Sequence, residues 1–225
     1  MTSNFPKSSS QLPINDKFLR VSQAKSLQLI SLSRLLIPLL LQTGIILAAP
    51  ARNIYIEFTG KTVTLETTPV NPDDILRGNY VVLDYNISRI ETLKKLPGWN
   101  QLIKQYPGTN QQYFPIAQDT SLYVIMQGKK STQAWKPMRI TSELPLSLPE
   151  NQVALRGQYR YGSVIYGLEK YNIPENQSEK INKDVFNNQK TLNKHSQPIK
   201  IKIKVDGRGN AVLINMQIGN DYYQF

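Results

Sequence analysis

Two groups of acidic residues could supply the acid and base of a hydrolytic enzyme. Asp73 and Asp74 are adjacent and shortly precede Arg77. Glu169 and Glu175 follow much later in the chain. Glycoside hydrolysis uses two carboxyl groups flanking the scissile bond, and an aspartate facing a glutamate across a cleft would provide them. The aspartates and Arg77 could equally bind a cation or hold a turn through local hydrogen bonds. Because nothing in the spacing requires catalysis, we expect a turn and no catalytic residue.

The composition excludes the catalytic centres that are most easily recognised from sequence. The chain has no Cys and a single histidine, His195, among 225 residues. Thiol nucleophiles, disulfides, thiolate zinc sites and multi-histidine metal centres are therefore excluded. We expect neither a cofactor nor a bound metal.

The chain is basic, with 27 Lys and Arg against 16 Asp and Glu and a net charge of +11. Most of the excess lies in residues 1–34 and 180–208. Nucleic-acid-binding proteins usually cluster arginine with aromatic residues on one face, which is not the pattern here, so we expect no nucleic-acid partner. Residues 199–205 alternate lysine with isoleucine or valine and predict an amphipathic strand. Its lysines either discourage pairing at a sheet edge or contact anionic lipid headgroups.

Residues 29–49 are mostly apolar and follow a polar, basic arm. A helix over them would be about 31 Å long, which matches the hydrocarbon core of about 30 Å in a bilayer. Arg34 would reach the headgroups with its long side chain. Positive residues before the span favour a cytoplasmic N-terminus. The sequence thus predicts a disordered cytoplasmic arm over residues 1–26, a single-pass transmembrane signal anchor over residues 27–50 and an extracytoplasmic domain over residues 51–225.

Two other interpretations of the apolar segment stay open. Residues 49–51, Ala-Pro-Ala, resemble the small-x-small site at which a signal peptide is cleaved. A buried helix of a soluble protein could also be apolar, although an almost uniformly apolar surface behind a basic arm disfavours it. We expect the uncleaved anchor because the arm is long for the basic region of a signal peptide.

Beyond the anchor, short segments of alternating or β-branched residues are typical of strands. These segments are residues 54–58, 61–67, 80–87, 121–126, 151–159, 164–171, 199–205 and 211–218. The Asp-Gly and Arg-Gly pairs at residues 206–209 predict a tight turn that closes a hairpin.

Helical signals are confined to two regions of this domain. Ser88 and Glu91 have the spacing of a capping box, and the apolar residues of segment 99–106 recur at helical spacing. A further helical turn is expected near residues 180–188. The predicted fold is therefore mainly β: an N-terminal transmembrane helix followed by a β-barrel or sandwich-like domain with one or two short helices.

Residues 69–85, Pro-Val-Asn-Pro-Asp-Asp-Ile-Leu-Arg-Gly-Asn-Tyr-Val-Val-Leu-Asp-Tyr, resemble the signature of the GDYXXLXY family of bacterial membrane-anchored proteins. The family's Gly, Tyr, Leu and Tyr correspond to Gly78, Tyr80, Leu83 and Tyr85. Asn79 stands where the family has Asp. A role that needs a carboxylate there would be lost, whereas an Asx-type turn bond would survive.

Residues 166–175 resemble the second block of that family, an aromatic-Gly-Ile/Leu-Glu-Arg/Lys-Tyr run ending in Pro-Glu. Its candidate interaction residues are Tyr166, Gly167, Glu169, Tyr171 and Glu175. The resemblance covers residues 28–225 and implies a membrane anchor followed by one β-rich domain. Members commonly accompany multi-spanning membrane proteins, and the family carries no established activity.

We expect the two blocks to lie close together in space and to stabilise the domain. Arg77 and Glu169 are complementary, and tyrosines offer a large apolar area with a polar tip that needs a partner. The strand period places Val81, Leu83 and Tyr85 on one face and their neighbours on the other. The core Leu-Arg-Gly-Asn-Tyr of the first block also recurs as Leu-Arg-Gly-Gln-Tyr at residues 155–159.

Together these features predict a non-enzymatic accessory protein that is anchored in the lipid bilayer and binds an integral-membrane protein. The alternative is a cell-envelope enzyme, or a binder of an anionic polymer, that uses Asp73 or Asp74 with Glu169 or Glu175.

Overall fold

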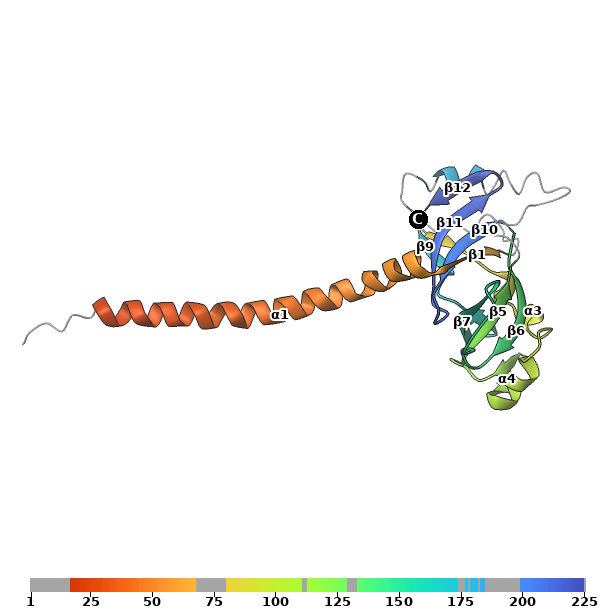
Figure 1. Ribbon diagram of the computed structural model, residues 1–225, viewed down its shortest axis with the longest axis horizontal. Helices are drawn as coiled ribbons and strands as arrows, with labels where there is room; N and C mark the ends of the chain where they lie inside the picture. The colour runs from red at the N-terminus through yellow and green to blue at the C-terminus, as the bar shows by residue number, and fades with distance from the viewer. Residues whose placement is uncertain are drawn as a thin grey trace, which may run out of the picture. The chain divides into compact units, whose positions relative to one another are not determined.

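A computed structural model of the protein describes residues 17–67, 80–110, 113–128, 133–173, 177, 179–181, 183–184 and 199–224. The chain divides into two units, Met1–Ala51 and Arg52–Phe225. The first contains most of one long helix, and the second contains the β-sheets (Figure 1).

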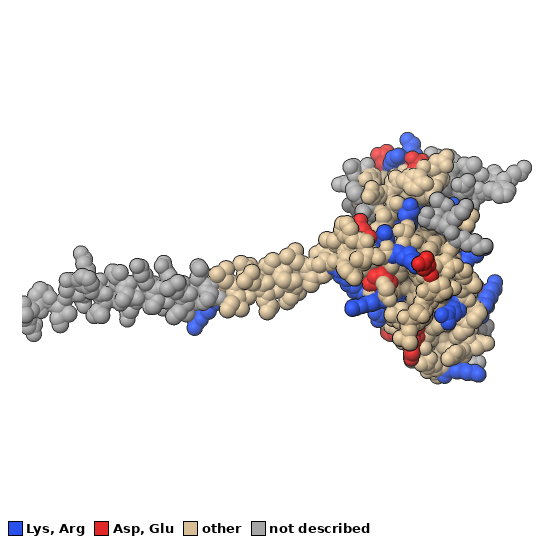
Figure 2. Space-filling model, in the orientation of Figure 1, with Lys and Arg blue, Asp and Glu red and all other residues tan. Residues whose placement is uncertain are grey.

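Helix α1 runs over Lys17–Thr59 and contains the whole predicted anchor. Within the described residues, the stretch Arg34–Thr59 is long and apolar enough to cross a membrane. Figure 2 shows a tan surface without charged side chains along the middle of the helix, just beyond its grey section. The expectation of a disordered arm was wrong for residues 17–26, which are helical, because adding a residue to an existing helix costs far less than starting one.

The last turns of α1 belong to the β-rich unit and correct a second expectation. Residues 54–58 were predicted as a strand, yet they are helical. Thr59 Oγ1 donates to the Tyr55 carbonyl at 2.7 Å, and the Gly60 amide donates to the Ile56 carbonyl at 2.8 Å. Ile56 is buried in the β-rich unit. The low cost of extending an existing helix, together with the burial of one residue, Ile56, thus outweighs the strand preference of the isoleucines and tyrosine.

The first sheet has the strand order β1-β10-β11-β12 and is antiparallel throughout. Its strands are β1 (Lys61–Glu66), β10 (Lys200–Val205), β11 (Ala211–Ile218) and β12 (Asp221–Gln224). The predicted alternation in β10 is confirmed, since Ile201, Ile203 and Val205 are buried and the three lysines are half-buried. However, β10 lies between β1 and β11, so these lysines do not protect a sheet edge.

The second sheet has the order β6-β5-β7-β8. Its strands are β5 (Ser121–Gln127), β6 (Lys136–Thr141), β7 (Gln152–Arg160) and β8 (Ser163–Ile165). One core cluster draws side chains from both sheets, and no barrel closes around it. Backbone hydrogen bonds join the sheets at two places, from Trp135 to Thr64 at 2.8 Å and from Arg156 to Gly209 at 2.9 Å. The mainly β, sandwich-like fold is thus confirmed.

The predicted turn at residues 206–209 is also confirmed. It joins β10 to β11, with the Asp206 amide donating to Asn210 O at 2.9 Å and the Gly209 amide donating to Asp206 O at 3.1 Å. Gly209 has φ +85°, which favours glycine. A Cβ there would stand 3.0 Å from the Ala154 carbonyl, so this glycine also permits the turn to approach β7.

Smaller elements complete the β-rich unit. They are β2 (Tyr80–Val82), η1 (Asn86–Ser88), α3 (Ile90–Leu93), α4 (Trp99–Gln105), β3 (Pro107–Asn110), β4 (Phe114–Ile116) and β9 (Lys170–Asn172). The predicted helix at residues 99–106 is confirmed, and it buries Trp99 and Leu102. Figure 1 shows it at the end of the second sheet that is remote from β12.

The capping box at residues 88–91 was wrong. The residue that caps α3 is Arg89, and no side chain bonds the helix start. The Ser88 amide instead donates to Tyr85 O in the preceding short helix, and its hydroxyl is buried without a partner among the described residues. The tertiary environment that buries Ser88 therefore prevents it from serving as a cap. The helical turn expected near residues 180–188 falls largely outside the described residues, of which 180, 181, 183 and 184 are helical.

Candidate functional site

The described parts of the two sequence blocks form one antiparallel strand pair. Strands β2 and β9 align Tyr80 with Asn172 and Val82 with Lys170. The Leu83 amide extends the ladder by donating to the Glu169 carbonyl at 2.8 Å. The expectation that the blocks lie close together in space is confirmed for these residues.

Several predicted site residues lie outside the described residues, and their roles stay predictions. They are Asp73, Asp74, Arg77, Gly78, Asn79 and Glu175. The expected ion pair between Arg77 and Glu169 is therefore untested, as is any approach of an aspartate to a glutamate. Tyr171 is placed in β9 through its backbone.

The predicted faces of the first block are correct. Val81, Leu83 and Tyr85 are buried in the core, whereas their neighbours Tyr80, Val82 and Asp84 are half-buried. On the outer side, the Lys170 ammonium lies 5.9 Å from the centre of the Tyr80 ring, within the range of a cation–π contact. This contact links the blocks on the face opposite the core.

Two buried tyrosines brace the blocks in opposite directions. The Tyr85 hydroxyl, from the first block, donates to the Leu168 carbonyl of the second at 2.8 Å. The Tyr166 hydroxyl, from the second block, donates to the Ile87 carbonyl just after the first at 2.6 Å. Burial raises the pKa of both hydroxyls above the ordinary tyrosine value, and the Glu169 carboxylate raises both further. Both tyrosines therefore stay neutral donors.

Glu169 uses its carboxylate to hold a turn. Its Oε1 accepts the backbone N–H of Tyr166 at 2.5 Å. Gly167 lies within this turn with φ +78°, a conformation that favours glycine. The strand predicted over residues 164–171 was therefore wrong as a single element: it is split into β8 and β9 at this turn.

Gly157 on β7 is a site residue that the sequence reasoning did not select. A Cβ there would stand 2.4 Å from Val164 Cγ1 and 2.9 Å from Tyr166 Cε1. Glycine thus leaves room for the Tyr166 ring to reach its hydrogen-bond position. The recurrence of Leu-Arg-Gly around this residue was the available signal, but it does not reveal which ring packs on the glycine.

A cleft of about 430 Å³ opens in the β-rich unit beside these blocks. Its walls come from the last turns of α1, from β5 and β7, from the turn after β10, and from the Ile165–Gly167 region. Two arginines, Arg52 and Arg156, line it together with Asn53, Ser121 and Gln158, and none of the described lining residues is acidic. A smaller cleft of about 290 Å³ adjoins it and shares Asn53, Gly167 and Ala211. The arrangement can bind an anion.

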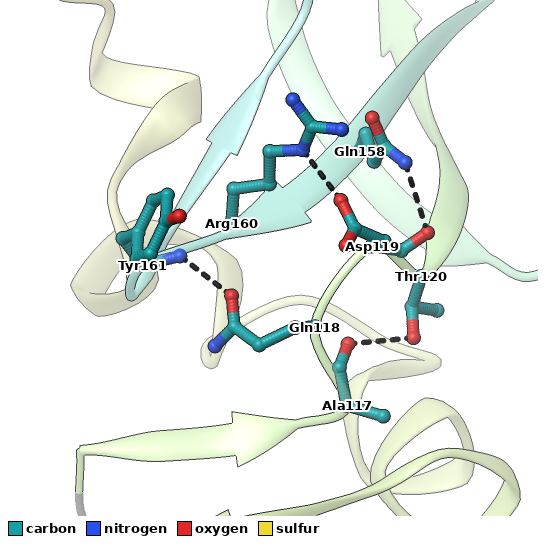
Figure 3. Close-up of polar contacts among 7 residues, drawn as sticks. All are labelled: Ala117, Gln118, Asp119, Thr120, Gln158, Arg160 and Tyr161. Atoms are coloured by element: carbon teal, nitrogen blue, oxygen red, sulfur yellow. Dashed lines mark hydrogen bonds and ion pairs between the residues drawn. The ribbon is translucent and has the colours of Figure 1, made fainter.

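A second polar cluster surrounds the turn before β5 (Figure 3). Asp119 Oδ1 pairs with Arg160 Nε at 2.5 Å, and the Tyr161 amide donates to Gln118 Oε1 at 2.9 Å. The side-chain amide of Gln158 donates through Nε2 to the backbone carbonyl of Asp119 at 3.1 Å. Asp119 and Tyr161 both have positive φ, of 62° and 50°. These contacts tie the end of β7 to the turn, and the one carboxylate drawn is already paired.

Among the described residues, no group of three or more His, Asp or Glu side chains could hold a metal ion. The fold and the paired blocks define a β-rich protein carried behind an apolar helix. A family model described as GDYXXLXY protein matches residues 42–216, and the chain belongs to this family. No curated protein and no solved structure matches the chain significantly.

Proposed function

We propose that the protein is a membrane-anchored accessory protein whose β-rich domain lies outside the cytoplasm and binds an integral-membrane partner. One observation carries the proposal: the leucine and isoleucine side chains of segment 35–47 are exposed on all sides of α1, between 45% and 69%. In water such a surface would aggregate, whereas the hydrocarbon of a bilayer solvates it. A helix suits that environment because it satisfies its backbone hydrogen-bonding groups internally.

The spacing of charges along α1 supports the same proposal. Arg34 and Arg52 flank a stretch without charged residues, and 18 residue steps at 1.5 Å separate them by about 27 Å. This length is close to a hydrocarbon core of about 30 Å. With the basic arm of residues 1–26 in the cytoplasm, the span of residues 27–50 carries residues 51–225 to the other side.

An accessory role is favoured over catalysis by how the family residues are used. Tyr85, Tyr166 and Glu169 are all engaged in holding the backbone of the two blocks. The alternative, an envelope enzyme or a binder of an anionic polymer, needs Glu169 or Glu175 to face Asp73 or Asp74. The turn contact of Glu169 weighs against that use.

A partner helix could approach α1 most closely at Gly44. Nothing lies within 4 Å of a Cβ placed there, and Ala48 lies one turn further along the same face. Small residues at this spacing let two membrane helices pack closely. Gly44→Leu should therefore weaken partner binding, whereas Gln42→Leu, on a different face, should not.

The test is purification of the tagged full chain in mild detergent, followed by mass spectrometry, for the parent and both variants. We expect one multi-spanning protein to co-purify with the parent and with Gln42→Leu, and to be depleted with Gly44→Leu. Recovery of no membrane protein above an unrelated single-span control would contradict partner binding.

Topology is tested separately through the absence of native Cys. Ser8→Cys and Asn220→Cys each introduce one thiol, which a membrane-impermeant maleimide labels only from outside the cell. We expect labelling at position 220 and protection at position 8. Alkaline carbonate should leave the intact chain in the membrane pellet, and release of a shortened chain would establish cleavage.

A further inference from the structure

We infer that the cleft lined by Arg52 and Arg156 is a binding site for a phosphate group, with an anionic phospholipid headgroup as the source that its position favours. The lipid source rests on the proposed membrane anchoring, whereas the phosphate chemistry rests on the cleft alone.

The turn between β10 and β11 brings the two arginines to one place. Arg52 Nη2 donates to the side-chain oxygen of Asn210 at 2.5 Å. The Arg156 amide donates to the carbonyl of the adjacent Gly209 at 2.9 Å. Each arginine is therefore one hydrogen bond from neighbouring residues of a single turn, although the two stand far apart in the sequence.

The guanidinium groups keep donors available for a ligand. Among the described residues, Arg89 and Arg160 each pair with an aspartate, whereas Arg52 contacts only a neutral amide oxygen and the Arg156 side chain has no partner. A guanidinium has five N–H donors in a planar fork that fits phosphate. Two such groups on one cleft are suited to a phosphate with two or more free oxygens.

The remaining surface of the cleft favours an anion as well. Asn53 and Ser121 contribute amide and hydroxyl groups that can donate. The nearby carboxylate of Asp206 is occupied, since it accepts from the Asn210 side chain at 2.9 Å and from the Arg208 amide at 2.9 Å. A concave surface with positive charge and no free carboxylate on its described lining focuses a field that attracts anions.

The position of Arg52 along α1 favours a lipid source. Arg52 lies two residues beyond the predicted end of the span, so the chain can separate them by at most about 7 Å. The headgroup region extends about 5–8 Å beyond the hydrocarbon core on each side. If the helix is anchored as proposed, Arg52 itself is at the depth of the lipid phosphates.

The test uses the full chain and two variants, each of which removes one arginine and therefore one positive charge. Arg156→Ala alters the cleft, and Arg139→Ala is the matched control, an exposed arginine on β6 that does not line it. One arm counts phosphatidylglycerol retained by native mass spectrometry after release from nanodiscs of phosphatidylcholine and phosphatidylglycerol. The other arm titrates inorganic phosphate into the detergent-solubilised protein by calorimetry. Equal melting temperatures verify that both variants fold.

We expect the parent and Arg139→Ala to retain phosphatidylglycerol and bind phosphate, and Arg156→Ala to bind at least tenfold more weakly, a loss of about 1.4 kcal/mol. Retention of lipid without phosphate binding would support the headgroup as ligand. Phosphate binding without lipid retention would support the site but overturn its lipid source. Binding that is absent in the parent, or equally weakened by both variants, would overturn the inference. Release of the chain by carbonate would refute the anchor without affecting phosphate binding that depends on Arg156.

Discussion

The reciprocal tyrosine braces predict a specific loss of stability when one hydroxyl is removed. Tyr166→Phe keeps the ring that packs on Gly157 but deletes the donor to the Ile87 carbonyl. Because Tyr166 is only 8% exposed, the carbonyl is left without this donor where water has little access. Leaving a buried acceptor unsatisfied costs about 1–3 kcal/mol.

This loss is large enough to measure by thermal unfolding. For a domain of 150–250 residues, about 1 kcal/mol shifts the melting temperature by about 2–4 °C, so Tyr166→Phe should lower it by about 2–12 °C. The assay is circular dichroism or scanning calorimetry of the full chain in detergent. Tyr161→Phe is the matched control, because Tyr161 is 86% exposed and its hydroxyl should contribute almost nothing.

A double variant separates the brace from simple loss of a hydroxyl. Tyr85→Phe removes the opposite donor, to Leu168, and should destabilise to a similar degree. Because both bonds hold the same pair of blocks, the destabilisation of the combined variant should differ from the sum of the destabilisations of the two single variants. If Tyr166→Phe melts like Tyr161→Phe, the hydroxyl is not a brace and the structural role of the signature tyrosines is refuted.

Three further predictions follow from the same region. Burial raises the pKa of Tyr85 and Tyr166, so the native state keeps two protons that the unfolded chain loses near pH 10. Their contribution to the free energy of unfolding is complete below about pH 10 and falls above it by up to about 1.4 kcal/mol per pH unit for each tyrosine. Melting temperatures measured at stepped pH should therefore decline less steeply in the double variant Tyr85→Phe/Tyr166→Phe than in the parent. Tyr159→Phe should leave the melting temperature unchanged or raise it, because the Tyr159 hydroxyl is buried without a partner among the described residues; a loss like that of Tyr166→Phe would show that it has one. Gly157→Ala should destabilise by about 1–3 kcal/mol in denaturant unfolding, because its Cβ would stand 2.4 Å from Val164 Cγ1, and an unchanged midpoint would contradict the close packing.

Local patterns were sufficient for the elements whose faces depend on near neighbours. The alternation over residues 199–205 and 80–85 predicted which side chains would be buried, because a strand turns successive residues to opposite faces whatever its partner is. The turn at residues 206–209 followed from its Asp-Gly and Arg-Gly pairs, and Gly209 supplies a backbone conformation that other residues avoid.

The candidate site was only partly accessible to the same reasoning. The resemblance of two blocks to one family indicated that they belong together, and the β2–β9 pair shows how they meet. The spacing could not show that Tyr85 and Tyr166 donate in opposite directions, or that Glu169 holds its own turn. Those contacts depend on which carbonyl lies within reach after the chain has folded.

The sequence by itself determined that an apolar helix precedes a mainly β domain, and which face of several strands is buried. Only the tertiary structure decided that β10 is an interior strand, that the helix continues to Thr59, and that Arg52 and Arg156 share a cleft. The reason is that hydrophobic periodicity specifies which face of a segment is buried but does not determine which other element packs against that face. Partners are selected by hydrogen bonds and packing between residues far apart in the chain, as with Gly209 and Arg156, and these form only when the whole core is assembled.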